Sequence, residues 1–276
     1  AMTGSLSTQQ VRHFEQHGYL CPLAGIPAVE AGDYAARLAD YEERLGVEPQ
    51  KYFKIKAHIA APWMVELGRH STLVDAVESL IGPDILLFGA SLFSKKAHDS
   101  RFVSWHQDSA YYGLDPHEEV TVWVALTESR RENGCLRVMP GSHRGPDLKH
   151  DETYDPENLL ARGQTIRGLN ESDAIDLELE AGQISIHQER TVHGSLGNGS
   201  DRARIGLAYF YMPAHTRSTL GRRRATMIRG VDRYGHWDAD RLPQHDLDPV
   251  SIEELKAAWK AYQDRGFSQS AETTPQ

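Results

Sequence analysis

The sequence has little cysteine and no long run of apolar residues. Only Cys21 and Cys135 occur among the 276 residues, which is too few for a disulfide framework. No apolar stretch reaches the length of a membrane-spanning helix or of a signal-peptide core. These absences predict a protein of the reducing cytoplasm that has no membrane partner.

Positive charge is also scarce. The chain carries 30 Lys and Arg residues against 39 Asp and Glu residues, which gives a formal net charge of −9. A chain with this balance does not attract nucleic acid or anionic membrane surfaces broadly. We therefore expect a small-molecule partner and no nucleic acid, whereas the sequence leaves the oligomeric state open.

The length and composition predict a single domain over residues 7–267. With 39% hydrophobic residues, the chain is able to fill one large core. Residues 1–6, which surround a possible start at Met2, are expected to be an added or disordered leader. The polar residues 268–276 are expected to be a frayed tail.

Three regions are expected within this domain. Helical support occupies residues 7–82, a catalytic barrel occupies 84–213, and a helical segment occupies 214–267. A polar stretch at about 147–173 interrupts the barrel region as a long insertion. An insertion of this length could act as a lid over a binding site.

Local signals predict the helices. Ser7 and Gln10 have the spacing of a capping box, and Gly18 is placed to end the helix that they begin. Ser71 is expected to cap another helix, which Gly82 and Pro83 stop. Further amphipathic helices are predicted at about 29–45 and at about 251–262.

Strand signals dominate after Asp84. Apolar or alternating segments, bounded by turn residues, predict strands at 85–93, 120–126, 134–139, 177–179, 183–187, 191–196 and 204–212. The predicted fold class is therefore mainly β with flanking helices.

The pattern His106-Gln107-Asp108, followed by His193, indicates a metal site. If His106 and Asp108 lie on a strand, the two-residue period places both side chains on one face. His193 follows His106 by 87 positions (193 minus 106) and could supply a third ligand from a later strand. Two histidines and one carboxylate are the ligand set of non-haem Fe(II) oxygenases and leave open coordination positions.

Two alternatives bear on this assignment. A lone His-x-Asp pair is usually a hydrogen-bonded surface pair and not a metal site. His187 competes with His193 for the third ligand position, but it lacks the Gly-Ser that follows His193 and an arginine at the spacing of Arg204. We therefore interpret His187 as a structural residue.

Several segments together resemble the phytanoyl-CoA dioxygenase family. They include the Phe14–Tyr19 stretch and extend over roughly Val11 to Pro213, in matching order and spacing. The other segments are Trp105–Asp108, Val120–Leu126, Glu132–Leu136, Pro140–His143, Ala181–Gln183 and His193–Ser195. The resemblance implies a double-stranded β-helix (jelly-roll, cupin-like) core that uses Fe(II), 2-oxoglutarate and dioxygen. Within the family, the chain is similar to the branch that contains syringomycin-type halogenases.

Arg204 gives a separate reason to expect 2-oxoglutarate. When this cosubstrate chelates a metal through its C1 carboxylate and C2 ketone, the distal carboxylate needs a partner, and a guanidinium binds it bidentately. Small Gly206 and Ala208 are expected to leave room for a ligand beside Arg204. Ser195 and Trp123 could line the same pocket.

The expected reaction is hydroxylation of an aliphatic C–H bond, with release of succinate and CO2. Halogenation is disfavoured because Asp108 holds the position that a halide would need, and Gly113 and Phe210 also differ from the halogenase pattern as we align it. Two alternatives belong to other classes. One is a cupin-like metal-dependent isomerase or hydrolase, in which Arg204 binds the substrate. The other is a catalytically inactive barrel that only binds a ligand.

The substrate is expected to be a small charged metabolite, such as an amino acid derivative, a betaine-like compound or an aminophosphonate, and not an acyl-CoA. Tyr111 and Tyr112, with Trp105 or Trp63, could form an aromatic surface for an ammonium group. Lys54, Lys56 and His58 alternate on a possible strand and offer positive charge for an anion. The arginine run 222–224 is interpreted as solvated, with a basic lid as the alternative.

Overall fold

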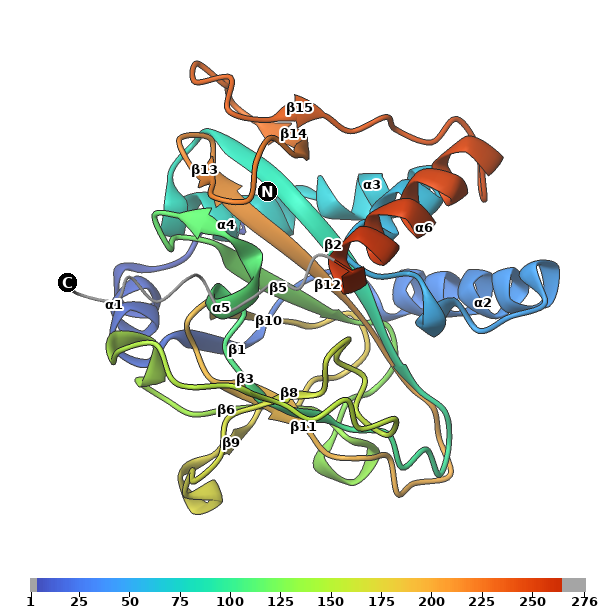
Figure 1. Cartoon of the computed structure of the whole chain (residues 1–276). Helices are drawn as coiled ribbons and strands as arrows, with labels where there is room; N and C mark the ends of the chain where they lie inside the picture. The colour runs from blue at the N-terminus through green and yellow to red at the C-terminus, as the bar shows by residue number, and fades with distance from the viewer. Residues whose placement is uncertain (1–3, 265–276) are drawn as a thin grey trace.

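Two antiparallel sheets form the centre of the molecule. The computed structural model describes residues 4–264. The larger sheet has the strand order β1-β10-β5-β12-β2-β14-β15, and the smaller has the order β3-β11-β6-β9. Figure 1 shows the smaller sheet lying beneath the larger one, with most of the helices on the far side of the larger sheet. This arrangement confirms the mainly β, jelly-roll prediction.

The strand bounds come close to those that the hydrophobic pattern predicts. The larger sheet consists of β1 (Tyr19–Leu23), β10 (Ile184–Gln188), β5 (Val120–Ala125), β12 (Arg204–Pro213), β2 (Ile85–Lys95), β14 (Arg224–Arg229) and β15 (Asp238–Ala239). The smaller sheet consists of β3 (Val103–His106), β11 (His193–Ser195), β6 (Leu136–Val138) and β9 (Ile175–Asp176). Two short pairs complete the strands, namely β4 (Leu114–Asp115) with β13 (Arg217–Ser218), and β7 (Asp151–Glu152) with β8 (Gln164–Thr165).

The predicted strand at 177–179 is wrong in its position, since the strand there is β9, at Ile175–Asp176. Leu179 instead makes an isolated bridge with Ser129. The physical reason is that apolar side chains reach the core from irregular backbone as readily as from a strand, so an apolar run does not by itself define a strand.

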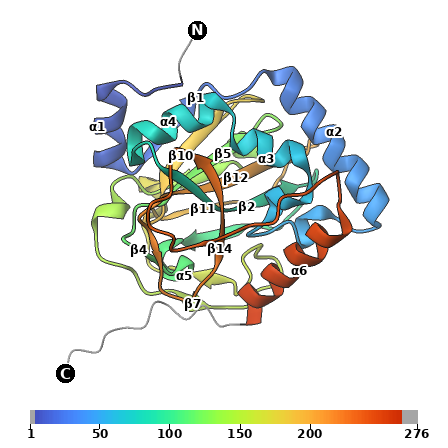
Figure 2. The same ribbon diagram turned by 90° about the horizontal axis from the view of Figure 1, so that it is seen from above.

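Most of the helices lie on the outer face of the larger sheet or at its side. They are α1 (Thr8–His17), α2 (Ala28–Leu45), α3 (Pro62–Gly68), α4 (Ser71–Ile81), the single turn α5 (Ser109–Tyr112) and α6 (Pro249–Asp264). Seen from above in Figure 2, α3 and α4 lie over the strands of the larger sheet, and α2 and α6 lie at its side. The capping box of α1 and its left-handed end at Gly18 are confirmed.

The start of α4 corrects one prediction. The residue that caps this helix is His70, whose Nδ1 accepts a hydrogen bond from the amide of Thr72, and Ser71 is the first helical residue. A further helix that was not predicted is α3, a seven-residue helix that begins at Pro62, a residue type that favours the first helical position. Short helices of this kind depend on tertiary contacts more than on their own hydrogen bonds.

Both faces of the larger sheet are covered, as β12 shows. Leu207, Tyr209 and Tyr211 belong to the core on the helical side. Ala208 and Phe210 belong to the core that faces the smaller sheet. The alternation follows the two-residue period of a strand, and burial on both faces explains why this strand has an almost continuous apolar sequence.

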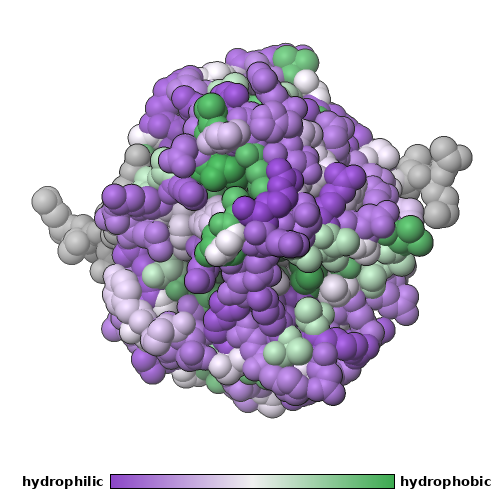
Figure 3. Space-filling view, turned by 90° about the vertical axis from the view of Figure 1, so that its right-hand side faces the viewer, coloured by the Kyte–Doolittle hydropathy of each residue, from purple (hydrophilic) through white to green (hydrophobic). Residues whose placement is uncertain are grey.

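The surface carries no broad apolar face in the view of Figure 3, where hydrophobic side chains form small patches separated by hydrophilic ones. Among the residues that the structure describes, no helix is both long enough and apolar enough to span a membrane. The predicted leader at residues 1–6 lies partly outside the described residues, and the predicted tail at 268–276 lies wholly outside them.

A segment next to β2 depends on a glycine. The amide of Ala90 donates to the carbonyl of Ile55, and the amide of Leu92 donates to that of Phe53. A Cβ on Gly89 would lie 1.8 Å from the Ile55 carbonyl oxygen. The absence of a side chain at Gly89 therefore allows residues 53–55 to lie directly on β2.

We predict opposite effects for two Gly→Ala changes. Gly89→Ala should destabilise the fold by about 1–3 kcal/mol, because the added methyl overpacks against backbone. Gly32→Ala should stabilise it by about 0.5–1 kcal/mol, because Gly32 lies in α2 with nothing within 4 Å of the new Cβ. Urea unfolding of both variants measures the difference. Equal shifts of the same sign would contradict the close approach at Gly89.

Candidate active site

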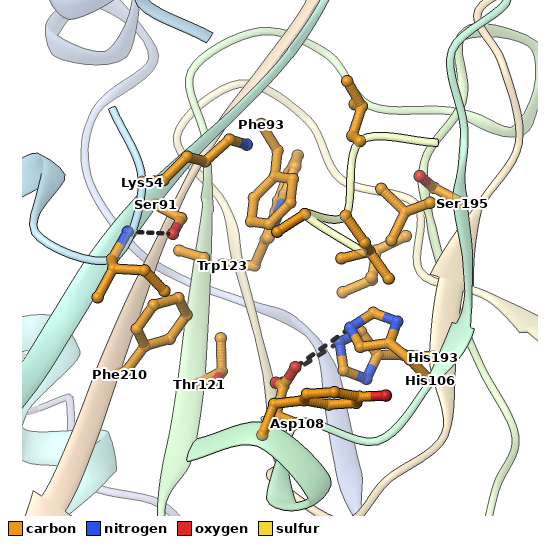
Figure 4. A pocket seen from close by; sticks show the side chains of 18 of the residues that line it. Lys54, Ser91, Phe93, His106, Asp108, Thr121, Trp123, His193, Ser195 and Phe210 are labelled. Atoms are coloured by element: carbon orange, nitrogen blue, oxygen red, sulfur yellow. Dashed lines mark hydrogen bonds and ion pairs between the residues drawn. The ribbon is translucent and has the colours of Figure 1, made fainter. Parts of the chain in front are cut away.

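Three side chains meet where β3 and β11 pair. His106, the last residue of β3, is the antiparallel partner of His193, the first residue of β11. The Asp108 carboxylate lies 3.1 Å from His106 Nε2 through Oδ1 and 3.6 Å from His193 Nε2 through Oδ2. The three donor atoms all lie within 4.8 Å of one another, and all three residues are buried. Figure 4 shows the three side chains pointing toward one point.

The predicted backbone for this motif is wrong. Asp108 does not continue β3 but begins the turn α5, with φ −66° and ψ −32°. The carboxylate therefore comes from a helical turn and not from the same face of a strand. The turn brings Asp108 beside His106 all the same, because the chain bends back toward the end of the strand.

Backbone carbonyls orient both imidazoles. Nδ1 of His106 lies 2.8 Å from the Ser104 carbonyl, and Nδ1 of His193 lies 2.8 Å from the Thr191 carbonyl. Because a carbonyl only accepts, each Nδ1 must carry the proton, which leaves each Nε2 lone pair for a metal.

The charge states suit a cation. Burial and the neighbouring His106 lower the pKa of His193 well below its ordinary value, so that the imidazole stays neutral. Burial opposes ionisation of Asp108, but His193 and His106 hold the pKa of this carboxyl well below its ordinary value. A neutral imidazole at His193 and a carboxylate at Asp108 are the protonation states in which these groups bind a divalent metal.

Gln107 fixes the turn between the two candidate ligands. Its side-chain amide donates to the Arg190 carbonyl, and its Oε1 accepts from the amide of Leu148. Its backbone amide donates to Nε2 of His150. These bonds join the His-x-Asp turn to the segment before β11 and to the start of the insertion.

His187 lies closer to the site than a purely structural interpretation suggests. Its ring centroid is 4.3 Å from that of His193, and its Nε2 is 3.9 Å from Asp108 Oδ2. Neither ring nitrogen has a hydrogen-bond partner among the described residues. His187 does not belong to the cluster of His106, Asp108 and His193, however, and its structural role stays a prediction.

Arg204 is a buried cation in the same pocket. It is 1% exposed, and its Nε and Nη2 have no hydrogen-bond partner among the described residues. Burial lowers the pKa of Arg204 to about 10, which still leaves it charged at neutral pH. Its guanidinium carbon lies 5.3 Å from the centre of the Trp123 ring. Such a group is stable only if an anion or another acceptor reaches it.

Lys95, which the sequence argument missed, connects Ser195 with the strand position of Arg204. Lys95 is the strand partner of Arg204, and its Nζ donates to Ser195 Oγ at 2.6 Å and to the Leu196 carbonyl. Burial and Arg204 lower the pKa of Lys95 to about 6. The sequence signal that could have identified Lys95 is its position at the end of a mostly apolar strand.

Gly206 does not leave the ligand space that we expected. A Cβ at this position would lie 2.0 Å from Cζ2 of Trp123, so the indole already fills the room beside the glycine. Ala208, Phe210, Trp123, Ser195 and Arg204 do line the pocket, together with the three candidate ligands. The small residue at 206 thus positions Trp123 beneath Arg204.

The two lysines predicted to bind substrate have separate environments. Lys54 lines the pocket, whereas Lys56 does not. The Lys56 ammonium donates to the carbonyls of Phe88 and Arg224 and pairs with Asp240. The predicted strand is absent, since Lys56 directly precedes the short helix at Ala57–Ala60. Lys56 therefore lies outside this pocket, and its assignment to the substrate stays a prediction without support from the geometry.

Tyr111 and Tyr112 both line the pocket, as expected. The tryptophans proposed to accompany them do not. Trp63 donates to Tyr41 Oη, and Trp105 donates to Glu171 Oε1, in other parts of the molecule.

The arginine run also lies outside this pocket. Arg222 pairs with Asp238, and Arg223 donates to the carbonyls of Tyr112 and Gly113. Arg223 therefore supports the turn behind the tyrosines instead of covering the site as a basic lid.

Two further segments contribute to the wall of the site, namely α6, which the sequence argument did not place there, and the insertion, which it predicted as a lid. Trp259 and Tyr262 come from α6, and Leu159, Leu160, Ala161 and Gln164 come from the insertion. Arg162 ties these segments together, because its Nη2 donates to the carbonyl of Gln263. The insertion thus lies over the pocket, while its opening and closing as a lid remain a prediction.

Comparison with known proteins identifies a family model over most of the chain. The model for phytanoyl-CoA dioxygenase (PhyH) matches residues 14–206. A probable phytanoyl-CoA dioxygenase from Caenorhabditis elegans is 25% identical over 278 residues, which cover 90% of this chain and 88% of the relative. A probable alpha-ketoglutarate-dependent hypophosphite dioxygenase from Stutzerimonas stutzeri is 29% identical over 157 residues, covering 56% of this chain and 54% of the relative.

Solved structures with the same architecture include oxygenases. The non-heme monooxygenase ThoJ is 30% identical, with a TM-score of 0.80 over 93% of this chain and 96% of that chain. CytC3 with Fe(II) and alpha-ketoglutarate matches at 22% identity and a TM-score of 0.66, over 90% of this chain and 98% of that chain. The second likeness shows the shared fold.

Of the three buried histidines next to Asp108, we predict that His193 and His187 differ in their contribution to metal binding. His193→Ala should lower the affinity for Fe(II) by more than about 100-fold, because a ligand is lost, whereas His187→Ala should lower it by less than about 10-fold. Anaerobic competition against a chromophoric chelator measures both affinities, with circular dichroism as the check on folding. An equal loss in the two variants would show that the third ligand is wrongly assigned.

Proposed function

Because the chain belongs to the phytanoyl-CoA dioxygenase family, whose members are non-haem Fe(II) and 2-oxoglutarate-dependent dioxygenases, we propose that it hydroxylates an aliphatic C–H bond of a small charged metabolite. One observation carries the proposal. A cluster of two histidines and one carboxylate shares its pocket with a buried arginine that has unpartnered donors. The first feature suits Fe(II), and the second suits the distal carboxylate of 2-oxoglutarate.

Each group has a distinct task in this proposal. His106, Asp108 and His193 hold Fe(II) on one side, and Arg204 neutralises the cosubstrate, with Trp123 and Ser195 beside it. When bound, Fe(II) with 2-oxoglutarate and dioxygen supplies the oxidising power and yields succinate and CO2. The protein contributes position, since rigid strands and a pinned turn hold the donors before the substrate arrives.

The pocket walls exclude water from the reacting carbon. Leu159 and Leu160 of the insertion and Trp259 of α6 provide apolar surface beside the candidate ligands. Exclusion of water limits oxidation that is uncoupled from substrate. The insertion and α6 therefore protect the reaction as well as shape the pocket.

Two other activities make different demands on the same residues. A halogenase needs a small residue at position 108, and the carboxylate of Asp108 lies beside both histidines instead. Incorporation of chloride by the wild-type protein would overturn the hydroxylase proposal. A cupin-like isomerase or hydrolase would use Arg204 for its substrate and would form no succinate.

We predict that anaerobic addition of Fe(II) and 2-oxoglutarate gives the weak visible charge-transfer band of the metal chelate. His193→Ala should abolish the band through loss of the metal. Arg204→Ala should raise the 2-oxoglutarate concentration needed for half-saturation by about 10-fold or more, because a charge-assisted pair contributes about 1.5–3 kcal/mol.

Arg222→Ala is the matched control, because it removes an exposed arginine outside the pocket. It should leave the titration unchanged. Bound Fe(II) without a band in the wild-type protein would remove 2-oxoglutarate from the proposal and favour the cupin-like alternative.

The proposed substrate class rests on the charges and rings of the pocket. Lys54 offers an ammonium group for an anion, and Tyr111 and Tyr112 offer aromatic rings for a cationic group. The hypophosphite dioxygenase relative acts on a small phosphorus oxyanion, as its name states. A small-molecule partner in the cytoplasm is part of the same proposal.

A substrate panel tests this class. We predict succinate formation above the uncoupled rate with amino acid derivatives, betaine-like compounds or aminophosphonates, and no such increase with acyl-CoA thioesters. Succinate is measured at equal 2-oxoglutarate and oxygen for every compound. Stimulation by the thioesters alone would contradict the proposed substrate class and leave the reaction type intact.

A further inference from the structure

A second chamber adjoins the pocket that contains the candidate metal ligands. We call it the outer chamber, and its polar lining consists of Gln50, Lys51, Lys54, Arg101, Tyr154, Asp155, Asn158 and Gln263. The two cavities share the side chains of Lys54, Leu159, Leu160, Ala161 and Trp259. These shared residues lie at the boundary of the two cavities, which we call the neck and which is apolar apart from Lys54. Figure 4 shows Lys54 beside Phe93, on the far side of the pocket from Asp108.

Lys54 is a buried lysine without a carboxylate partner among the described residues, and burial, together with Arg101 and Arg204, lowers its pKa to about 7, so that a bound anion would favour its charged form. It is 5% exposed, and its Nζ donates to the Leu92 carbonyl at 2.7 Å and lies 4.3 Å from the centre of the Phe93 ring. Arg101 in the same chamber differs, because Asp99 and Glu48 pair with it. An ammonium has three donors, and the described hydrogen bonds of Lys54 use one of them.

Gln50 presents an unused donor to the same chamber. Its Oε1 accepts a hydrogen bond from the amide of Ser94, which fixes the orientation of the side-chain amide. Its Nε2 is buried and has no hydrogen-bond partner within residues 4–264. A buried donor without a partner is costly unless a ligand accepts from it. Lys54 and Gln50 thus independently indicate an acceptor-bearing ligand.

The cosubstrate cannot pair with both Arg204 and Lys54, the two cationic residues of the pocket that lack a carboxylate partner among the described residues. One carboxylate of 2-oxoglutarate binds the metal in the proposed function, and Arg204 takes the other. Lys95, the remaining buried lysine near Arg204, has Ser195 Oγ as a partner and does not line the pocket. The charge of Lys54 is therefore left for an anionic group that belongs to the substrate.

We propose that the outer chamber binds a carboxylate of the substrate through Lys54 Nζ and Gln50 Nε2. The rest of the substrate passes through the neck between Leu160 and Trp259 to the candidate metal site. One ammonium and one amide suit a monoanion with two oxygens better than a dianionic phosphate group. The substrate class is thus an elongated carboxylate with an apolar middle, hydroxylated at a carbon remote from the carboxylate.

The position of the oxidised carbon rests on the proposed function, whereas the carboxylate subsite does not. Binding is therefore tested without turnover. The probes are 4-phenylbutanoate, 4-phenylbutylamine and 4-phenylbutan-1-ol, titrated into the full-length protein while tryptophan fluorescence is followed, since Trp259 lies in the neck. We expect the carboxylate to bind about 10-fold or more tightly than the amine.

Two variants locate the subsite, and a third variant is the control. Lys54→Met and Gln50→Glu should each weaken binding of 4-phenylbutanoate by about 10-fold or more, and binding of 4-phenylbutan-1-ol by less than about 2-fold. Gln50→Glu keeps the acceptor for Ser94 and adds a charge that repels the probe. Lys96→Met removes an exposed lysine that pairs with Glu42 and Glu48 outside both cavities, and it should change neither affinity.

The outcomes separate this proposal from the previous one. Equal affinity for the carboxylate and the amine, or binding that is unaffected by Lys54→Met, would overturn the subsite. So would a Lys54→Met protein that loses the 2-oxoglutarate band, because Lys54 would then serve the cosubstrate. A wild-type protein that forms no band, yet binds 4-phenylbutanoate through Lys54, would retain the subsite and refute only the proposed oxygenase chemistry.

Discussion

The antiparallel pairing of β3 with β11 is the constraint on which the candidate site depends. It places His106 directly opposite His193, although 87 positions separate them (193 minus 106). Side chains of a strand alternate between its faces, so a register shift of one residue would turn one imidazole away from the other. The other side of β11 pairs with β6, where His193 lies opposite Val138. Two neighbours therefore fix the register of a three-residue strand.

Buried charge is the second organising feature, and it depends on that frame. Asp108, Arg204 and Lys54 are each less than 10% exposed and point into one pocket. Burial of unpaired cations destabilises a fold, so a structure that retains them gives up stability for ligand recognition. The cost is distributed over ordered elements, since Arg204 begins the ten-residue strand β12 and Lys54 lies in the segment 53–55 that is hydrogen-bonded to β2.

The sequence predicted the features that depend on local chemistry. The capping box at Ser7, the end of α1 at Gly18 and the buried strands follow from residues that are close in the chain. The pairing of His106 with Asp108 was predicted for the wrong reason, because a strand and a helical turn can bring residues two apart to the same metal. A two-residue spacing therefore does not determine the backbone between the ligands.

Features that depend on distant contacts were not predictable in this way. Lys54 and Lys56 look equivalent in the sequence, but Asp240, which is 184 positions from Lys56, neutralises only the second. Gly206 looked like empty space because the sequence does not say that the Trp123 ring lies against it. In each case the outcome is set by a side chain from another strand or loop. Periodicity within one segment carries no information about such a partner.

The pocket extends beyond the region that the family model matches, which limits what sequence similarity says about the substrate. The family model ends at residue 206, after the three candidate ligands and Arg204. Trp259 and Tyr262 lie beyond it, on α6, and still line the pocket. The reaction class can therefore be transferred from relatives, whereas the substrate cannot, because part of the wall that contacts it lies outside the matched region. The shape and charge of this particular pocket are the better guide to the substrate.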